Sequence, residues 1–249
     1  MPRRLPALIA LDSAESLRAP AFDVMLLVVS GIAAALASIQ PVSNPAALAD
    51  AALDPAVVFA VSLYLAMRAS SGLAALANSG VMQVYLSYPL SRVEVALALY
   101  LSRILFPVLL LVGAPLVVAA AVAPGVVASN IAAYVAAYLS YVVYLVFLGT
   151  LFALIALVTR STGTAAVASL AAYFLYGGVS LLLNVMAASR GSQLLHRLAM
   201  AMSFYMVVSM KLQSPSIAVE AWQYLLVPLL LTAFLAAYIA YMKWRFEPP

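Results

Sequence analysis

The chain has 249 residues, of which 67% are hydrophobic and only 8% are charged, with a formal net charge of +4 and no cysteine. Soluble domains carry charge on about a quarter of their residues, so this composition excludes an ordinary soluble protein and predicts an integral membrane protein. The lack of cysteine excludes a disulfide framework and a thiolate metal site. A single histidine cannot supply a metal cage either.

The apolar segments are continuous runs that are long enough to cross a bilayer as helices. A transmembrane barrel would instead show segments of about ten residues that alternate apolar and polar side chains. The N-terminal segment 1–21 is basic and partly polar, and the long run after it favours a retained span over a cleaved signal peptide. We predict an all-α integral membrane protein, one transmembrane domain over 1–249, with six spans at 22–41, 56–77, 95–122, 130–158, 163–188 and 222–242.

Lysine and arginine decide the orientation, because they are retained on the cytoplasmic side. With both termini in the cytoplasm, the cytoplasmic face collects Arg3, Arg4, Arg18, Arg68, Arg92, Arg103, Arg160, Lys243 and Arg245. The outer face keeps only Arg190, Arg197 and Lys211. A seven-span arrangement would place Lys243 and Arg245 outside, against this rule. Arg68 and Arg103 lie near span ends, where we expect their side chains to snorkel towards the interface.

The outer segment 189–221 contains a strongly apolar stretch, 198–210, which is too short to cross the membrane. We expect a short re-entrant or interfacial helix on the outer side, before span 6. A buried helix of an outer cap is the alternative interpretation.

The loop between spans 2 and 3 is a polar interruption that reads YLSYPLSRVEV over residues 85–95. Its pattern predicts a short surface helix whose apolar and aromatic face comprises Val81, Val84, Tyr85 and Tyr88. Pro89 should end this helix, and Ser91 followed by Glu94 matches a capping box at the start of span 3. The residues alone fit either an element that passes a push from a bound partner into the membrane or a plain amphipathic helix resting on lipid.

The order of residues in this loop resembles the ABC-2 type permease family, the membrane subunits of one branch of ATP-binding-cassette transporters. The match runs over Gly80, Leu86, Ser87, Pro89, Ser91, Arg92 and Glu94, and the order of spans extends it over nearly the whole chain. The resemblance implies that residues 78–92, with Tyr85 and Tyr88, form a cytoplasmic coupling helix that docks on a separate ATPase subunit. It also implies that residues 194–212 form an element on the outer side.

Two features depart from the family pattern. Charged residues commonly precede the glycine, whereas AALANS precedes Gly80 here. A lysine usually found about a dozen residues after the proline is absent, and Arg103 is the nearest candidate for its place. These departures bear on how strongly the loop would dock to an ATPase.

The sequence contains no GxxxxGK[ST] phosphate-binding loop, so nucleotide chemistry would belong to a partner chain. The resemblance implies a cytosolic ATPase that binds ATP and Mg²⁺, and a second permease that is either a copy of this chain or a related one. We expect no catalytic residue, cofactor or metal in this chain, a lipid environment in the cell membrane, and no nucleic-acid partner. The resemblance also implies export.

An ion-coupled secondary transporter or channel that works without an ATPase is the alternative. Proton coupling usually leaves an ionisable group inside the membrane, and the carboxylates of this chain fall outside the span centres. Backbone carbonyls could still bind sodium. An intramembrane enzyme would need paired carboxylates, a metal cluster or a nucleophile with its base, which the spans do not supply. His196, in the outer segment, fits a surface or capping role.

Two polar stripes are candidates for a translocation path. The stripe on span 5 recurs at steps of three or four residues, which keeps one helix face polar, and it comprises Ser169, Tyr173, Tyr176, Ser180 and Asn184. A looser ladder on span 4 comprises Tyr134, Tyr138, Tyr141 and Tyr144. Such residues also serve helix packing, and Gly177-Gly178 fits a close approach of two helices. A path lined by these stripes would be uncharged and aromatic, suited to a lipid-like, amphipathic or hydrophobic-peptide substrate.

Overall fold

The computed structural model describes residues 4–17, 20–39, 43–87 and 90–245, and this part of the chain forms helices and no strand. Six helices in it are long and apolar enough to cross a membrane, which confirms the predicted all-α class and the number of spans. They cover Pro20–Ile39, Pro55–Asn78, Arg92–Val122, Ile131–Thr159, Thr162–Arg190 and Ala221–Trp244. By length and composition they fit a multi-pass membrane protein.

Three spans are single helices: α2 (Pro20–Ile39), α10 (Ile131–Thr159) and α11 (Thr162–Arg190). The sixth lies within α14 (Ala221–Arg245). The second and third spans each contain a π-helical segment. The second span comprises α4 (Pro55–Tyr64), η1 (Leu65–Ser70) and α5 (Ser71–Asn78). The third span comprises α7 (Arg92–Tyr100), η2 (Leu101–Leu105) and α8 (Phe106–Val122). The shorter helices are α1 (Arg4–Leu17), α3 (Pro45–Ala52), α6 (Val81–Ser87), α9 (Pro124–Ser129), α12 (Gln193–Met202) and α13 (Phe204–Gln213).

The breaks between helices follow from capping residues and proline. Asn44 caps α3 by accepting a hydrogen bond from the Ala47 amide at 2.8 Å, and Asp54 caps α4 through the Ala56 amide at 2.9 Å. Each cap is followed directly by a proline at the first helical position, where its missing N–H costs nothing. The proline-rich connection after the first span is therefore a short helix, α3, held between two caps.

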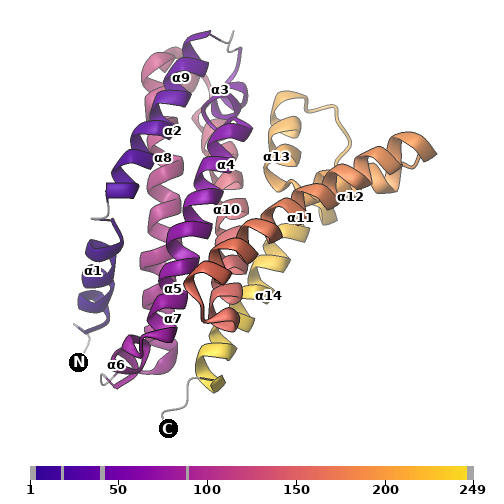
Figure 1. Ribbon diagram of the computed structural model, residues 1–249. Coiled ribbons are helices and arrows are strands. Elements are labelled where there is room, and N and C mark those ends of the chain that lie inside the picture. The colour runs from indigo at the N-terminus through magenta and orange to yellow at the C-terminus, as the bar shows by residue number, and fades with distance from the viewer. Residues whose placement is uncertain (1–3, 18–19, 40–42, 88–89, 246–249) are drawn as a thin grey trace.

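Helix α10 forms the centre of the bundle. It packs on α14, α11, α13, η1 and α3. In an apolar stretch of 18 residues, 67% of the residues of α10 are buried, against 6% in the corresponding stretch of α11. A helix that is apolar on all sides can be surrounded by other helices, whereas α11 carries polar side chains along one face and leaves its other faces open. In Figure 1, α11 leans away from the bundle with α12 beside it.

The first helix, α1, and the end of the last helix, α14, lie at one end of the bundle together with α6 (Figure 1). We call this end the termini end. Helices α3, α9 and α13 lie at the opposite end, which we call the distal end. The predicted even number of spans requires this arrangement, because each span carries the chain from one end to the other.

The segment expected to form one short helix, residues 198–210, is instead divided between α12 and α13. The backbone leaves the helical region at Ser203, with φ −98° and ψ 67°, so that the chain turns there. Serine is a weak helix former that favours such breaks. The distal element is therefore a pair of short helices, which we call the distal hairpin.

The two π-helical segments face each other near the termini end. A side chain at Gly72, in α5, would place its Cβ 2.7 Å from Nη1 of Arg103 in η2. Any larger residue at this position would therefore require the guanidinium of Arg103 to shift. Single-turn π segments are often found at functional sites, and here they carry Arg68 and Arg103.

Candidate functional site

The junction between α6 and α7 is the part of the predicted coupling loop that the structure describes in most detail. Ser91 Oγ accepts a hydrogen bond from the Glu94 amide at 3.2 Å, and the Ser91 amide donates to Glu94 Oε2 at 2.7 Å. This confirms the predicted capping box at the start of the third span. Tyr88 and Pro89 lie outside the described residues, and Leu86 and Ser87 are placed in α6 without a description of their side chains.

The start of the same loop depends on Gly80, which has φ +76° and connects α5 to α6. Side chains disfavour this left-handed conformation, which explains a glycine at this position of the motif. Val81, Val84, Tyr85 and Tyr88 were expected to form one face of α6, but the described members of this set do not share one environment. Val81 and Val84 are exposed, whereas Tyr85 turns inward with Met82 and is buried.

Arg92 links the loop to the last span. Its Nη1 donates to the carbonyl oxygen of Lys243 in α14 at 2.8 Å. The buried Tyr238, one turn further into α14, donates to the carbonyl oxygen of Ala96 in α7 at 3.3 Å. A displacement of the α6–α7 junction would therefore act on the third and sixth spans together.

Arg103 does not snorkel, which corrects the sequence interpretation. It is buried in η2, and its Nη2 lies 2.6 Å from Oδ1 of Asp12, a fully buried residue of α1. Its Nε approaches the two carboxylate oxygens of Asp12 at 3.2 and 3.1 Å, and Ser102 Oγ also donates to Asp12. The N-terminal helix thus supplies the partner that lets the arginine stay inside the span. The two residues are 91 positions apart in the sequence, so no local sequence pattern indicates that they pair.

The polar stripe of α11 faces the rest of the protein and is hydrogen-bonded along most of its length. Ser169 Oγ lies 2.9 Å from Ser70 Oγ, and Tyr176 donates to the Met202 carbonyl oxygen at 2.6 Å. Ser180 donates to the Ala199 carbonyl oxygen at 3.1 Å, and Asn184 Oδ1 lies 3.1 Å from His196 Nδ1. The stripe therefore holds the distal hairpin and η1 against α11, and its role in lining a path stays a prediction.

Tyr173, the remaining member of the stripe, packs on aromatic rings. Its ring centroid lies 5.8 Å from that of Phe59 and 5.5 Å from that of Phe174. The neighbouring Gly177 and Gly178 were expected to permit a close helix approach, but a Cβ at either would meet no atom within 4 Å. Within this chain the two glycines border open space.

The tyrosine ladder of α10 fixes the helices around it. Tyr134 donates to the Leu116 carbonyl oxygen, and Tyr138 to the Leu109 carbonyl oxygen at 3.4 Å. Tyr144 lies edge-on to Tyr205 of α13, with ring centroids 5.0 Å apart. The ladder thus connects α8 with the distal hairpin.

Tyr141 leads to a carboxylate that the sequence analysis missed. Its hydroxyl donates to Asp50 Oδ1 at 2.8 Å, while Ser209 and Gln213 of α13 donate to Asp50 Oδ2, the latter at 2.7 Å. Burial raises the pKa of Asp50 above its ordinary value of 3.8, although these hydrogen bonds oppose the shift. The four residues come from α3, α10 and α13, so only the folded chain brings them together.

Two cavities border the distal hairpin. The first, which we call the aromatic cavity, has a volume of about 520 Å³ and is lined by Tyr144, Tyr173, Phe174, Gly177, Gly178, Ser180, Leu181, Asn184, Ala199, Met200, Ser203, Tyr205 and Met206. It gathers four residues of the two predicted stripes, Tyr144, Tyr173, Ser180 and Asn184. Burial raises the pKa of Tyr205 to about 12, so that its hydroxyl is neutral at physiological pH.

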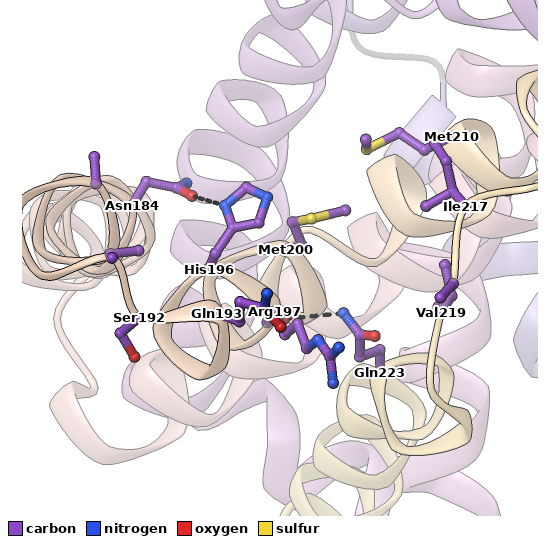
Figure 2. Close-up of a pocket in the computed structure, with 14 residues that line it drawn as sticks. Asn184, Ser192, Gln193, His196, Arg197, Met200, Met210, Ile217, Val219 and Gln223 are labelled. Atoms are coloured by element: carbon purple, nitrogen blue, oxygen red, sulfur yellow. Dashed lines mark hydrogen bonds between the residues drawn. The ribbon is translucent and has the colours of Figure 1, made fainter.

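The second cavity, which we call the polar cavity, is also about 520 Å³ and lies among the end of α11, α12 and the segment before α14. Figure 2 shows Asn184 and His196 facing each other, with Gln193, Arg197 and Gln223 nearby. Gln223 Nε2 donates to the Arg197 carbonyl oxygen at 3.2 Å, and the Arg197 guanidinium pairs with Glu220. Of this group, the sequence indicated a place in the polar stripe for Asn184 and a surface or capping role for His196.

No group of three or more histidine, aspartate or glutamate side chains in the described part of the chain could hold a metal ion. No protein-family model matches the chain, and no curated protein is similar to it at a significant level. The interpretation of the sites therefore depends on their geometry and on the sequence resemblance.

Proposed function

We propose that this chain is the transmembrane permease subunit of an ATP-binding-cassette transporter of the ABC-2 type. It contributes the path for export of a lipid-like, amphipathic or hydrophobic-peptide substrate. A separate cytosolic ATPase binds ATP and Mg²⁺ and supplies the energy, and a second permease, either a copy of this chain or a related one, completes the path. The chain itself performs no catalysis.

The junction of α6 and α7 is the observation that supports this proposal most strongly. A short helix at the termini end is joined through the Ser91–Glu94 capping box to the third span and through Arg92 to the carbonyl oxygen of Lys243. A partner that pushes on the exposed face of α6, which includes Val81 and Val84, would move two spans at once. An element of this kind suits a transporter whose energy comes from another subunit.

An ion-coupled secondary transporter or channel is the second candidate, and Asp50 favours it. Its carboxylate is surrounded by the neutral donors Tyr141, Ser209 and Gln213, and burial raises its pKa. Carboxylates in such surroundings are able to take up and release protons in coupled transport. Asp50 lies in α3, between the first two spans, rather than in the middle of a span.

Co-purification of the tagged protein from its native membrane distinguishes these candidates. We expect an ATPase with the wild type, and less of it with Val84→Asp and with the triple variant Pro89→Ala, Arg92→Ala, Glu94→Ala. Ser216→Asp, an exposed change in the segment before α14, is the matched control and should retain the ATPase. Failure to recover an ATPase with any of these proteins after chemical cross-linking would refute the proposal and favour the ion-coupled candidate.

A further inference from the structure

The two distal cavities meet at the contact between α11 and α12. Asn184 and Met200 line both of them, and the hydrogen bond between His196 Nδ1 and Asn184 Oδ1 lies where they meet. Each cavity is within the range of about 300–1,000 Å³ that is usual for a small-molecule site. One elongated molecule could therefore occupy both cavities at the same time.

The polar cavity offers several hydrogen-bond donors. Asn184 uses its amide oxygen for His196, which leaves its amide N–H groups as donors, and Gln193 is an exposed amide on the lining. Arg197, whose guanidinium pairs with Glu220, is the one lysine or arginine among the described residues that line the cavity. Donors of this kind recognise oxygen-rich groups such as phosphates, carboxylates and sugars. They give no favourable partner for a quaternary ammonium group.

The aromatic cavity has the opposite character. Tyr144, Tyr173 and Phe174 contribute rings, and Leu181 and Met206 contribute aliphatic surface. Gly177 and Gly178 leave open space on its α11 side, where an added Cβ would meet nothing. Such a lining favours a hydrocarbon chain, whose transfer from water contributes about 0.8 kcal/mol for each buried methylene group.

We propose that the two cavities together bind one amphipathic molecule, with an oxygen-rich headgroup in the polar cavity and its hydrocarbon chain in the aromatic cavity. This inference extends the proposed function, because it names the substrate class and the site on the distal side. It does not depend on the ATPase, since the cavities belong to this chain alone. The site can therefore be tested on the isolated protein.

Trp222 provides a reporter for the headgroup. Its Nε1 donates to Glu220 Oε2 at 2.6 Å, and Glu220 is the ion-pair partner of the cavity residue Arg197. The chain has two tryptophans, so Trp244→Phe leaves Trp222 alone. In bilayers of neutral phosphatidylcholine, we expect 2-bromododecanoate, brominated beside the carboxylate, to quench Trp222 more strongly than 12-bromododecanoate, brominated at the chain end.

Two variants test the two parts of the site. Gly177→Leu fills the aromatic cavity, and Gln193→Leu removes a donor from the polar cavity. Each should raise the Kd for 2-bromododecanoate about three- to tenfold, as expected for the loss of one favourable contact. Gly163→Leu is the matched control, because Gly163 lies on the same helix, also faces open space and lines neither cavity. It should leave the Kd unchanged.

Competition decides the headgroup. Dodecyl phosphate and dodecyl maltoside should displace the brominated probe at lower concentrations than dodecyltrimethylammonium, which shares only the hydrocarbon chain. Equal displacement by all three, stronger quenching by the 12-bromo compound, or wild-type affinity in both Gly177→Leu and Gln193→Leu would overturn the inference. Failure to recover an ATPase with the protein would refute the proposed function and leave these binding results intact.

Discussion

At the scale of single residues, the pairing of Asp12 with Arg103 explains how a charged side chain can lie inside the third span. A guanidinium in an apolar environment needs both an opposite charge and hydrogen-bond acceptors. Asp12 supplies both, through the 2.6 Å contact to Nη2 and the contacts to Nε. The helix that carries Asp12 is thereby fixed against η2, although α1 is outside the six spans.

We expect Asp12→Ala to destabilise the protein by about 3–5 kcal/mol, because it leaves the buried Arg103 charge without a partner. A titration with sodium dodecyl sulfate that follows the free energy of unfolding measures this loss. The double variant Asp12→Leu, Arg103→Met should recover most of it, since it replaces the pair by apolar side chains.

The pair of Arg197 and Glu220 is the control for this prediction, because both side chains are partly exposed, at 35% and 49%. Exposed pairs contribute about 0–1 kcal/mol, so Glu220→Gln should change the stability little. A loss in Asp12→Ala no larger than that in Glu220→Gln would contradict a structural role for the buried pair.

At the scale of elements, the sequence predicted what depends on local pattern. The six apolar runs gave the spans, and the spacing of Ser91 and Glu94 gave the cap of α7. It did not predict the break at Ser203, where a single backbone conformation divides an apolar stretch into α12 and α13. A turn of this kind depends on the surrounding helices, so the residue types alone do not determine it.

The candidate sites were predictable to different degrees for the same reason. The stripe from Ser169 to Asn184 follows from helical periodicity, and three of its members line the aromatic cavity. The contacts of Asp50 with Tyr141 and Ser209 join residues 91 and 159 positions apart. Distant contacts of this kind require the tertiary structure.

Asp50 also predicts how the attachment of α13 depends on pH. Burial raises its pKa in the folded protein above the value of 3.8 that applies to the unfolded chain. The folded state therefore binds the proton more tightly, and the contribution of this group to stability is full below pH 3.8 and is lost as the pH rises through the folded pKa. Tyr205, with a pKa of about 12, stays neutral throughout this range.

Asp50→Asn should remove this dependence, because its amide carries no charge at any pH. We expect the variant to gain stability relative to the wild type at neutral pH and to lose that advantage as the solution is acidified. Unfolding in sodium dodecyl sulfate at a series of pH values measures the difference. Asp23→Asn, at an exposed carboxylate in α2, should show no such trend, and an identical trend in the two variants would show that Asp50 is not its source.

At the scale of the whole molecule, the bundle has a central helix and one open side. Helix α10 is enclosed, whereas α11 exposes large apolar side chains, among them Val167, Leu175 and Leu182. Lipid or a second permease can cover this surface, and both belong to the proposed transporter. The lysine and arginine residues are distributed unequally between the two ends of the bundle. Most of them belong to segments towards the termini end, and Arg190, Arg197 and Lys211 belong to segments towards the distal end.

This distribution predicts the orientation in the membrane, with the termini end in the cytoplasm. Because the chain has no cysteine, single cysteines can be introduced at exposed serines without further changes. An impermeant maleimide should label Ser129→Cys and Ser216→Cys, at the distal end, in intact cells. It should reach Ser79→Cys and Ser161→Cys, at the termini end, only after permeabilisation. The reverse pattern would invert the protein and place α6 out of reach of a cytosolic ATPase, whereas labelling of only one distal site in intact cells would contradict the six spans.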